Sequence, residues 1–107
     1  MVKRLKKYCH LIRVFSKLDP KTQENILKKP DKDFIRLISE ICFNIQKKNV
    51  ILKDSDVKKL KKFAKYIKLF QSKSVSVRKK RSHILKGAGF LPTLFSVIAP
   101  LLTTLIR

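Results

Sequence analysis

The sequence has few of the residues that build metal sites and disulfide frameworks. It holds two cysteines and two histidines. Cys9 and Cys42 are too few for a disulfide framework or a four-ligand zinc site. Either could join His10 or His83 as a ligand pair, but free cysteine is most often a small core residue, and both lie on apolar helical faces. We therefore expect no metal and no other cofactor.

Glycines and paired catalytic groups are equally scarce. The two glycines, Gly87 and Gly89, follow no strand, so they form no phosphate-binding loop. Glu24 and Glu40 fall on separate predicted helices, and no nucleophile has a base beside it. The chain is therefore not expected to be an enzyme.

Acidic residues are far outnumbered by basic ones. The chain has 27 lysines and arginines against seven acids, a formal net charge of +20, and 21 of the 27 are lysine. Such a chain requires a polyanion: DNA, RNA or an anionic membrane surface. Lysine is a hydrated point charge that neutralises phosphates without reading bases. Because 44% of the residues are hydrophobic, the chain can still form a core, and no signal peptide is visible, so we expect a protein that is not secreted.

Apolar residues recur at helical spacing and predict an all-α fold, a small bundle of about four helices. The predicted helices cover residues 3–16, 20–29, 31–48 and 55–72. Asp19 caps the second helix, with Pro20 at its first position. The third helix is the most hydrophobic and is expected at the centre, with Asn49 as its left-handed cap.

The charge pattern divides the chain into three parts. These are a basic helical bundle (1–72), a basic linker (73–88) and an apolar tail (89–107).

Two groups of basic residues are the predicted nucleic-acid-binding site. The first lies on the fourth helix and consists of Lys58, Lys59, Lys61, Lys62, Lys65 and Lys68. The second is the cluster Arg78, Lys79, Lys80 and Arg81. A solvated face is the simpler interpretation, but such a face normally carries both signs of charge, so we favour polyanion binding.

The tail carries no charge between Lys86 and Arg107, and its 19 residues would span about 28 Å as a helix. Pro100 would kink that helix. Three interpretations stay open: a segment docked on the bundle, a tail anchor, or a membrane-active segment. The residues predicted to meet a membrane are Phe90, Leu91, Leu94, Phe95, Ile98, Leu101, Leu102 and Leu105.

A helix-turn-helix regulator is a further alternative, because Lys29-Pro30 could form the turn before the third helix. That helix would offer only Arg36, Asn44 and Gln46 to base edges, so we do not favour this hypothesis.

Three segments resemble a group of small proteins encoded by Polinton (Maverick) elements and adintoviruses. They are Asp31-Lys32-Asp33-Phe34-Ile35, Asn49-Val50-Ile51-Leu52 and Gly87-Ala88-Gly89-Phe90-Leu91. The resemblance implies a virion core or minor capsid protein, analogous to the adenovirus DNA-condensing mu peptide. Such a protein would be found in the host nucleus and in the virion core. The mu-type peptides are short and rich in arginine, whereas this chain is rich in lysine, so the analogy concerns the role.

One local match extends the resemblance. Adenovirus-type proteases cut sites of the form (Met/Ile/Leu)-x-Gly-x-Gly, which Leu85, Gly87 and Gly89 fit, with the cut after Ala88. Glycine lets an extended backbone lie close in a protease groove.

We therefore expect a DNA-condensing virion core protein that binds double-stranded DNA without sequence preference. A viral maturation protease would release its apolar segment. The alternative is a tail-anchored or membrane-lytic helical protein that binds anionic membranes.

Overall fold

The computed structural model describes residues 2–84 and 89–106, which form helices and connecting loops with no strand among them. The all-α prediction is therefore confirmed, while the helical segments are shorter and more numerous than the four predicted. In chain order they are α1 (Val2–Phe15), α2 (Pro20–Lys28), α3 (Lys32–Gln46), α4 (Asp54–Lys61), α5 (Ala64–Gln71), α6 (Val77–His83), α7 (Phe90–Ile98), the 3-10 turn η1 (Ala99–Leu101) and α8 (Leu102–Leu105).

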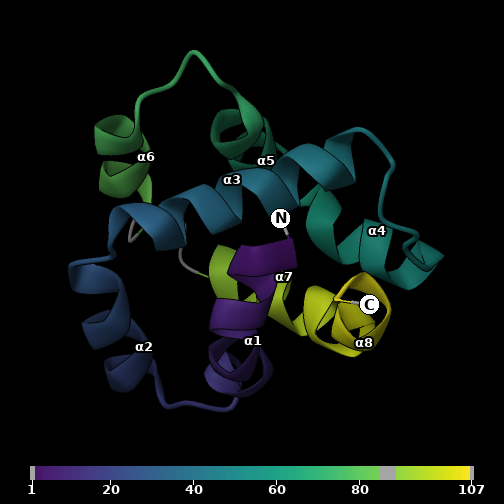
Figure 1. The fold of residues 1–107 in the computed structure, drawn as a ribbon, viewed down its shortest axis with the longest axis horizontal. Helices are drawn as coiled ribbons and strands as arrows, with labels where there is room; N and C mark the ends of the chain where they lie inside the picture. The colour runs from purple at the N-terminus through teal and green to yellow at the C-terminus, as the bar shows by residue number, and fades with distance from the viewer. Residues whose placement is uncertain (1, 85–88, 107) are drawn as a thin grey trace.

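Helix α3 lies at the centre, as its apolar sequence predicts. It contacts α5 and α6 on one side and α1 on the other, and α1 in turn contacts α7 and α8 (Figure 1). Its buried side chains are Phe34, Ile35, Leu37, Ile38, Ile41 and Cys42. These residues form a wide apolar stripe along one side of α3, and the packing of α1, α5 and α6 against the helix covers it.

Helices α2 and α3 begin where the sequence predicts. Asp19 is extended and precedes Pro20, which opens α2. The Asp31 carboxylate accepts a hydrogen bond of 2.7 Å from the backbone amide of Phe34, which satisfies one free donor of the first turn of α3.

The left-handed cap of α3 is Lys48 and not Asn49, with φ of 60° at Lys48. The amide of Lys48 donates to the Ile45 carbonyl at 3.1 Å, and the amide of Asn49 donates to the Asn44 carbonyl at 2.9 Å. These two bonds form a Schellman motif. Because α3 ends at Gln46, the motif places its left-handed position at Lys48, although asparagine tolerates that conformation better.

The predicted fourth helix is interrupted. Its apolar spacing suits one helix over residues 55–72, but a turn at Lys62-Phe63 separates α4 from α5. Phe63 leaves helical geometry, with φ of −109° and ψ of 18°, and its ring centroid lies 5.7 Å from that of Phe90. The interruption therefore coincides with a contact between Phe63 and a distant helix.

The last helices belong to the core. Phe90 lies 5.6 Å from Tyr66 and 5.8 Å from Phe70 between ring centroids, in stacked geometry. Phe95 makes edge-on contacts with Phe15 of α1 at 5.3 Å and with Phe34 of α3 at 6.0 Å between ring centroids. Helix α7 therefore joins α5 on one side to α1 and α3 on the other.

The structure places the residues predicted to meet a membrane inside or against this core. Phe90, Leu91, Leu94, Phe95, Ile98 and Leu102 are buried, and Leu101 and Leu105 are half-buried. Pro100 lies in η1, where the chain passes from α7 to α8. Within residues 2–84 and 89–106, no helix combines the length and the apolar character needed to cross a membrane.

Candidate nucleic-acid interface

Acidic residues of α3 hold α1 in place. Arg4 forms ion pairs with Asp33 at 2.9 Å and with Glu40 at 2.5 Å, and Lys7 pairs with Asp33 at 2.9 Å. The hydrogen bonds from Lys7 and Arg4 hold the pKa of Asp33 below its usual range. These carboxylates are therefore occupied with cations of the fold.

The acids near α4 and α2 sit at helix starts. Asp54 and Asp56 lie in the first turn of α4, where a carboxylate favours the positive end of the helix dipole. Asp19 precedes α2 and accepts a hydrogen bond from the hydroxyl of Thr22. Apart from Glu24 in the middle of α2, the acids thus lie at helix starts and at the α1–α3 junction, and little negative charge remains to balance the lysines elsewhere.

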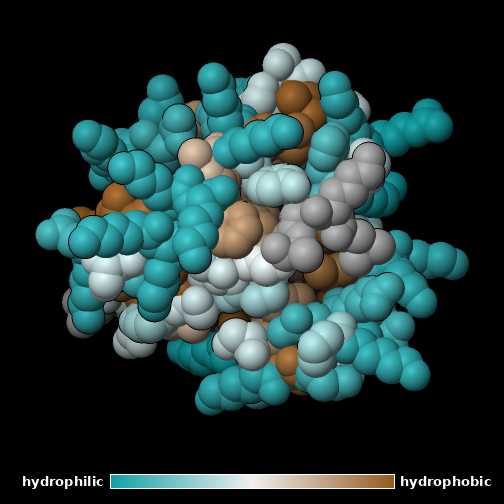
Figure 2. All heavy atoms as spheres, turned by 180° about the vertical axis from the view of Figure 1, so that it is seen from behind, coloured by the Kyte–Doolittle hydropathy of each residue, from teal (hydrophilic) through white to brown (hydrophobic). Residues whose placement is uncertain are grey.

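All six lysines predicted on the fourth helix are exposed. Lys58, Lys59 and Lys61 lie on α4, Lys62 lies in the turn, and Lys65 and Lys68 lie on α5. None of the six pairs with an acid of the described residues. Figure 2 shows the face opposite to that of Figure 1, where hydrophilic side chains project from nearly the whole outline and hydrophobic surface is confined to small patches between them.

The basic cluster on α6 is divided by its packing. Arg78 and Lys79 are exposed, and the exposed Arg81 donates from Nε to the backbone carbonyl of Pro30 at 3.2 Å. Lys80 is only 6% exposed, so the expectation that all four side chains face a polyanion needs correction. The physical reason is that α6 packs on α3, and Lys80 lies on the packing face.

Lys80 is buried beside polar and sulfur groups of α3. Its Nζ donates to Oγ of Ser39 at 3.0 Å. Burial lowers the pKa of Lys80, and burial raises the pKa of the Cys42 thiol to about 12. Lys80 therefore carries its charge at a cost, with a neutral hydroxyl rather than a carboxylate as its hydrogen-bond acceptor.

A hollow of about 490 Å³ beside Lys80 gathers cations that the sequence did not single out. Arg4, Arg36 and Lys73 line it together with Lys80, and Glu40 is the acid on its wall. Nζ of Lys73 lies 5.4 Å from the ring centroid of Phe43. The lining comes from α1, α3, α5, the loop after α5, and α6. Because these segments are far apart in the sequence, no local pattern could have predicted the hollow.

The predicted groups do not form one continuous site. In Figure 1, α4 and α6 lie at opposite sides of the molecule, with α5 between them. Three of the predicted cleavage residues, Leu85, Gly87 and Ala88, lie outside the described residues. Gly89 is described, and its φ of +87° precedes α7 in a left-handed conformation that favours glycine.

The cysteines and histidines do not assemble a metal site in the part of the chain that the structure describes, where no three metal-ligating side chains come together. Cys42 is buried and Cys9 is half-buried, and both are free.

Comparison with known proteins adds no relative to this picture: no family model, no curated protein and no solved structure matches the chain.

Proposed function

We propose that this protein binds double-stranded DNA without sequence preference and condenses it. The observation that carries the proposal is the set of six exposed lysines on α4, α5 and the turn between them, unpaired with any described acid. Together with a net charge of +20, this surface needs phosphates for neutralisation.

The spacing of α4 suits a DNA backbone. Its eight residues span about 12 Å, and one strand carries a phosphate for every roughly 3.4 Å of duplex axis, so a helix that lies along this axis passes three or four phosphates. Three lysines on α4 and Lys62 just beyond it supply a comparable number of charges. The basic hollow beside α6 offers a second place for a phosphate group.

Sequence reading is disfavoured by the position of α3. A helix-turn-helix protein would insert this helix into the major groove. Here α1, α5 and α6 pack around it, and Arg4 is held by Asp33 and Glu40. Arg81 also donates to the Pro30 carbonyl, so two of the arginines are engaged within the fold and fewer guanidinium groups can read guanine edges.

The resemblance to Polinton and adintovirus proteins supports a role as a virion core protein in the host nucleus, with a viral protease cutting after Ala88. The alternative, action on anionic membranes through residues 89–107, requires α7 to leave the core that it helps to form.

A salt titration with two matched variants tests the proposal. The first variant changes Lys58, Lys59, Lys62 and Lys65 to glutamine. The control changes Lys17, Lys21, Lys28 and Lys29 to glutamine, exposed residues on or near α2. Both variants lose the same charge, and glutamine preserves helix propensity.

Each lysine that contacts a phosphate adds about 0.9 to the slope of log affinity against log salt, so the first variant should lower that slope by about 3.6. Between about 50 and 200 mM salt, the wild type then loses roughly 150 times more affinity than this variant. Fluorescence anisotropy with two unrelated duplexes of about 20 base pairs measures both the affinity and its dependence on salt. Equal slopes for the two variants would mean that binding depends only on total charge, which would contradict a role for the lysines of α4 and α5. A strong preference for one duplex would contradict the proposal as well.

A further inference from the structure

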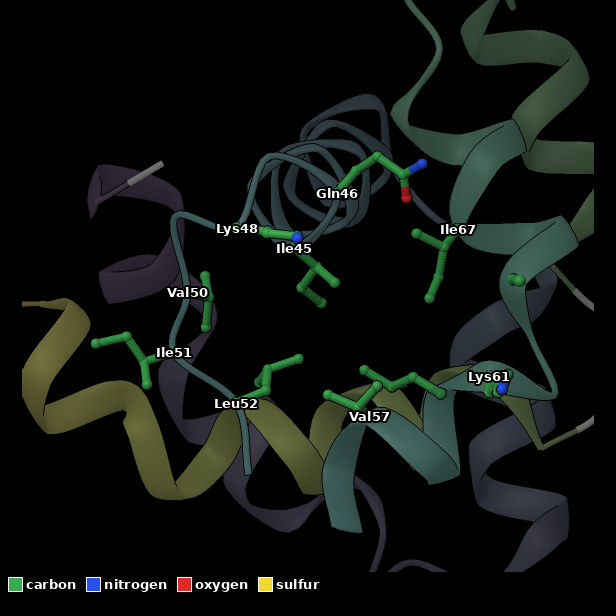
Figure 3. Close-up of a pocket in the computed structure, with 11 residues that line it drawn as sticks. Ile45, Gln46, Lys48, Val50, Ile51, Leu52, Val57, Lys61 and Ile67 are labelled. Carbon is green, nitrogen blue, oxygen red and sulfur yellow. The ribbon is translucent and has the colours of Figure 1, made fainter. Parts of the chain in front are cut away.

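An apolar groove opens on the side of the molecule away from α6. It lies between the end of α3, the link at residues 49–53, α4 and α5, and its volume is about 570 Å³ (Figure 3). Its lining consists of Ile45, Gln46, Lys48, Val50, Ile51, Leu52, Val57, Leu60, Lys61, Ala64 and Ile67. A groove of this size and composition is typical of a binding site.

Apolar surface remains uncovered in this groove. Ile51 is 90% exposed and Val57 is 50% exposed, and both line it. In Figure 3, Ile45, Leu52 and Ile67 point toward the central space from three different elements. Exposed large apolar side chains carry a free-energy cost in water, and their concentration at one groove marks a surface that a partner covers.

We propose that this groove binds an acidic amphipathic helix of a partner protein. Lys48 and Lys61 stand on opposite walls, so an apolar face between two acidic flanks would complement both the lining and the charge. The α4 wall is about 12 Å long, which accommodates two helical turns with apolar anchors at i, i+3 or i+4, and i+7.

The shape and charge of the groove favour this occupant over two others. A membrane takes up protruding apolar side chains, but only Ile51 and Val57 protrude here, and most of the apolar lining is recessed, with Leu60 at 3% exposure. A second copy brings another net charge of +20, which repels the first. Its Asp33 is already held in ion pairs with Arg4 and Lys7 of α1. A helix from a different, acidic protein meets neither obstacle.

Two peptides and three variants test the proposal. The probe is a labelled peptide of about 14 residues, roughly four turns, with leucines along one helical face and glutamates on the flanks. Its control is a scrambled peptide of the same composition, because a strongly cationic protein attracts any acidic peptide. Val57→Glu alters the groove, Ser55→Glu changes the same charge on the same helix outside it, and Ile51→Ser removes apolar surface without a charge change.

The proposal expects the patterned peptide to bind the wild type at least about tenfold more tightly than the scrambled one, a difference of roughly 1.4 kcal/mol. Val57→Glu should lose about tenfold in affinity relative to Ser55→Glu, and Ile51→Ser should weaken binding severalfold. Equal binding of the two peptides would overturn the proposal, as would equal affinities of Val57→Glu and Ser55→Glu. A third result would also overturn it: Val57→Glu weakens binding to anionic vesicles while the protein binds the two peptides equally. In that case the groove would face lipid.

Discussion

The contribution of the last helices to stability is measured by ending the chain at Ala88. This change removes seven fully or nearly fully buried side chains: Phe90, Leu91, Leu94, Phe95, Val97, Ile98 and Leu102. Burying such a side chain contributes about 1.5–3 kcal/mol, so the loss amounts to roughly 10–20 kcal/mol. Domains of this size are stable by about 5–15 kcal/mol in total. We therefore expect residues 1–88 alone to have no stable fold.

Thermal unfolding followed by circular dichroism, together with the dispersion of backbone amide resonances, measures this effect. A chain ending at Leu102 is the matched control, because it keeps all seven buried side chains and should retain a cooperative transition. A cooperative transition for residues 1–88 near the temperature of the whole chain would refute the reasoning. If the prediction holds, release of residues 89–107 onto a membrane would also unfold what remains.

Three further predictions concern side chains of α1, α3 and α6. Lys80→Met keeps the length of the side chain and removes a buried charge, so urea unfolding should show unchanged or higher stability, by about 1 kcal/mol, and DNA affinity should fall less than in Lys79→Met. Asp33 has a lowered pKa, so the unfolded chain binds its proton more readily and the ion pairs stabilise the fold above the usual carboxyl range. Asp33→Asn should therefore lower the urea midpoint at about pH 7 but hardly at about pH 2, and an equal decrease at both pH values would contradict this assignment. At about pH 8 a thiol reagent should modify Cys9 and leave Cys42 unmodified until the chain unfolds, because burial holds the Cys42 thiol protonated; rapid reaction of two thiols in the native protein would contradict it.

Local signals were enough to place the first helices. Pro20 at the start of α2 and the Asp31 cap of α3 act within one turn of chain, and the apolar stripe of α3 implies its central position. The break at Phe63 was not predictable in this way, because Val57, Leu60, Phe63 and the residues beyond fit one continuous stripe. At the break, Phe63 contacts the ring of Phe90, and the sequence had left three interpretations open for the segment that contains Phe90.

The candidate site shows the same division. Exposure of Lys58 and its neighbours follows from helical periodicity, so the sequence could place them. Within the run Arg78–Arg81, composition treats every residue alike, and only the contact of α6 with α3 selects Lys80 for burial. The hollow lined by Arg36 and Lys73 was missed because it exists only after distant segments meet.

The stacking of Phe90 on Phe70 of α5 and the edge-on contact of Phe95 with Phe15 also set the order of events during synthesis. The ring partner of Phe15 in the first helix comes from the much later α7, so the earlier segments cannot complete the core before α7 has been synthesised. A nascent chain with most of its lysines already made and no finished interior would be exposed to ribosomal RNA and to chaperones. Acquisition of the native state must therefore wait until α7 has emerged from the ribosome.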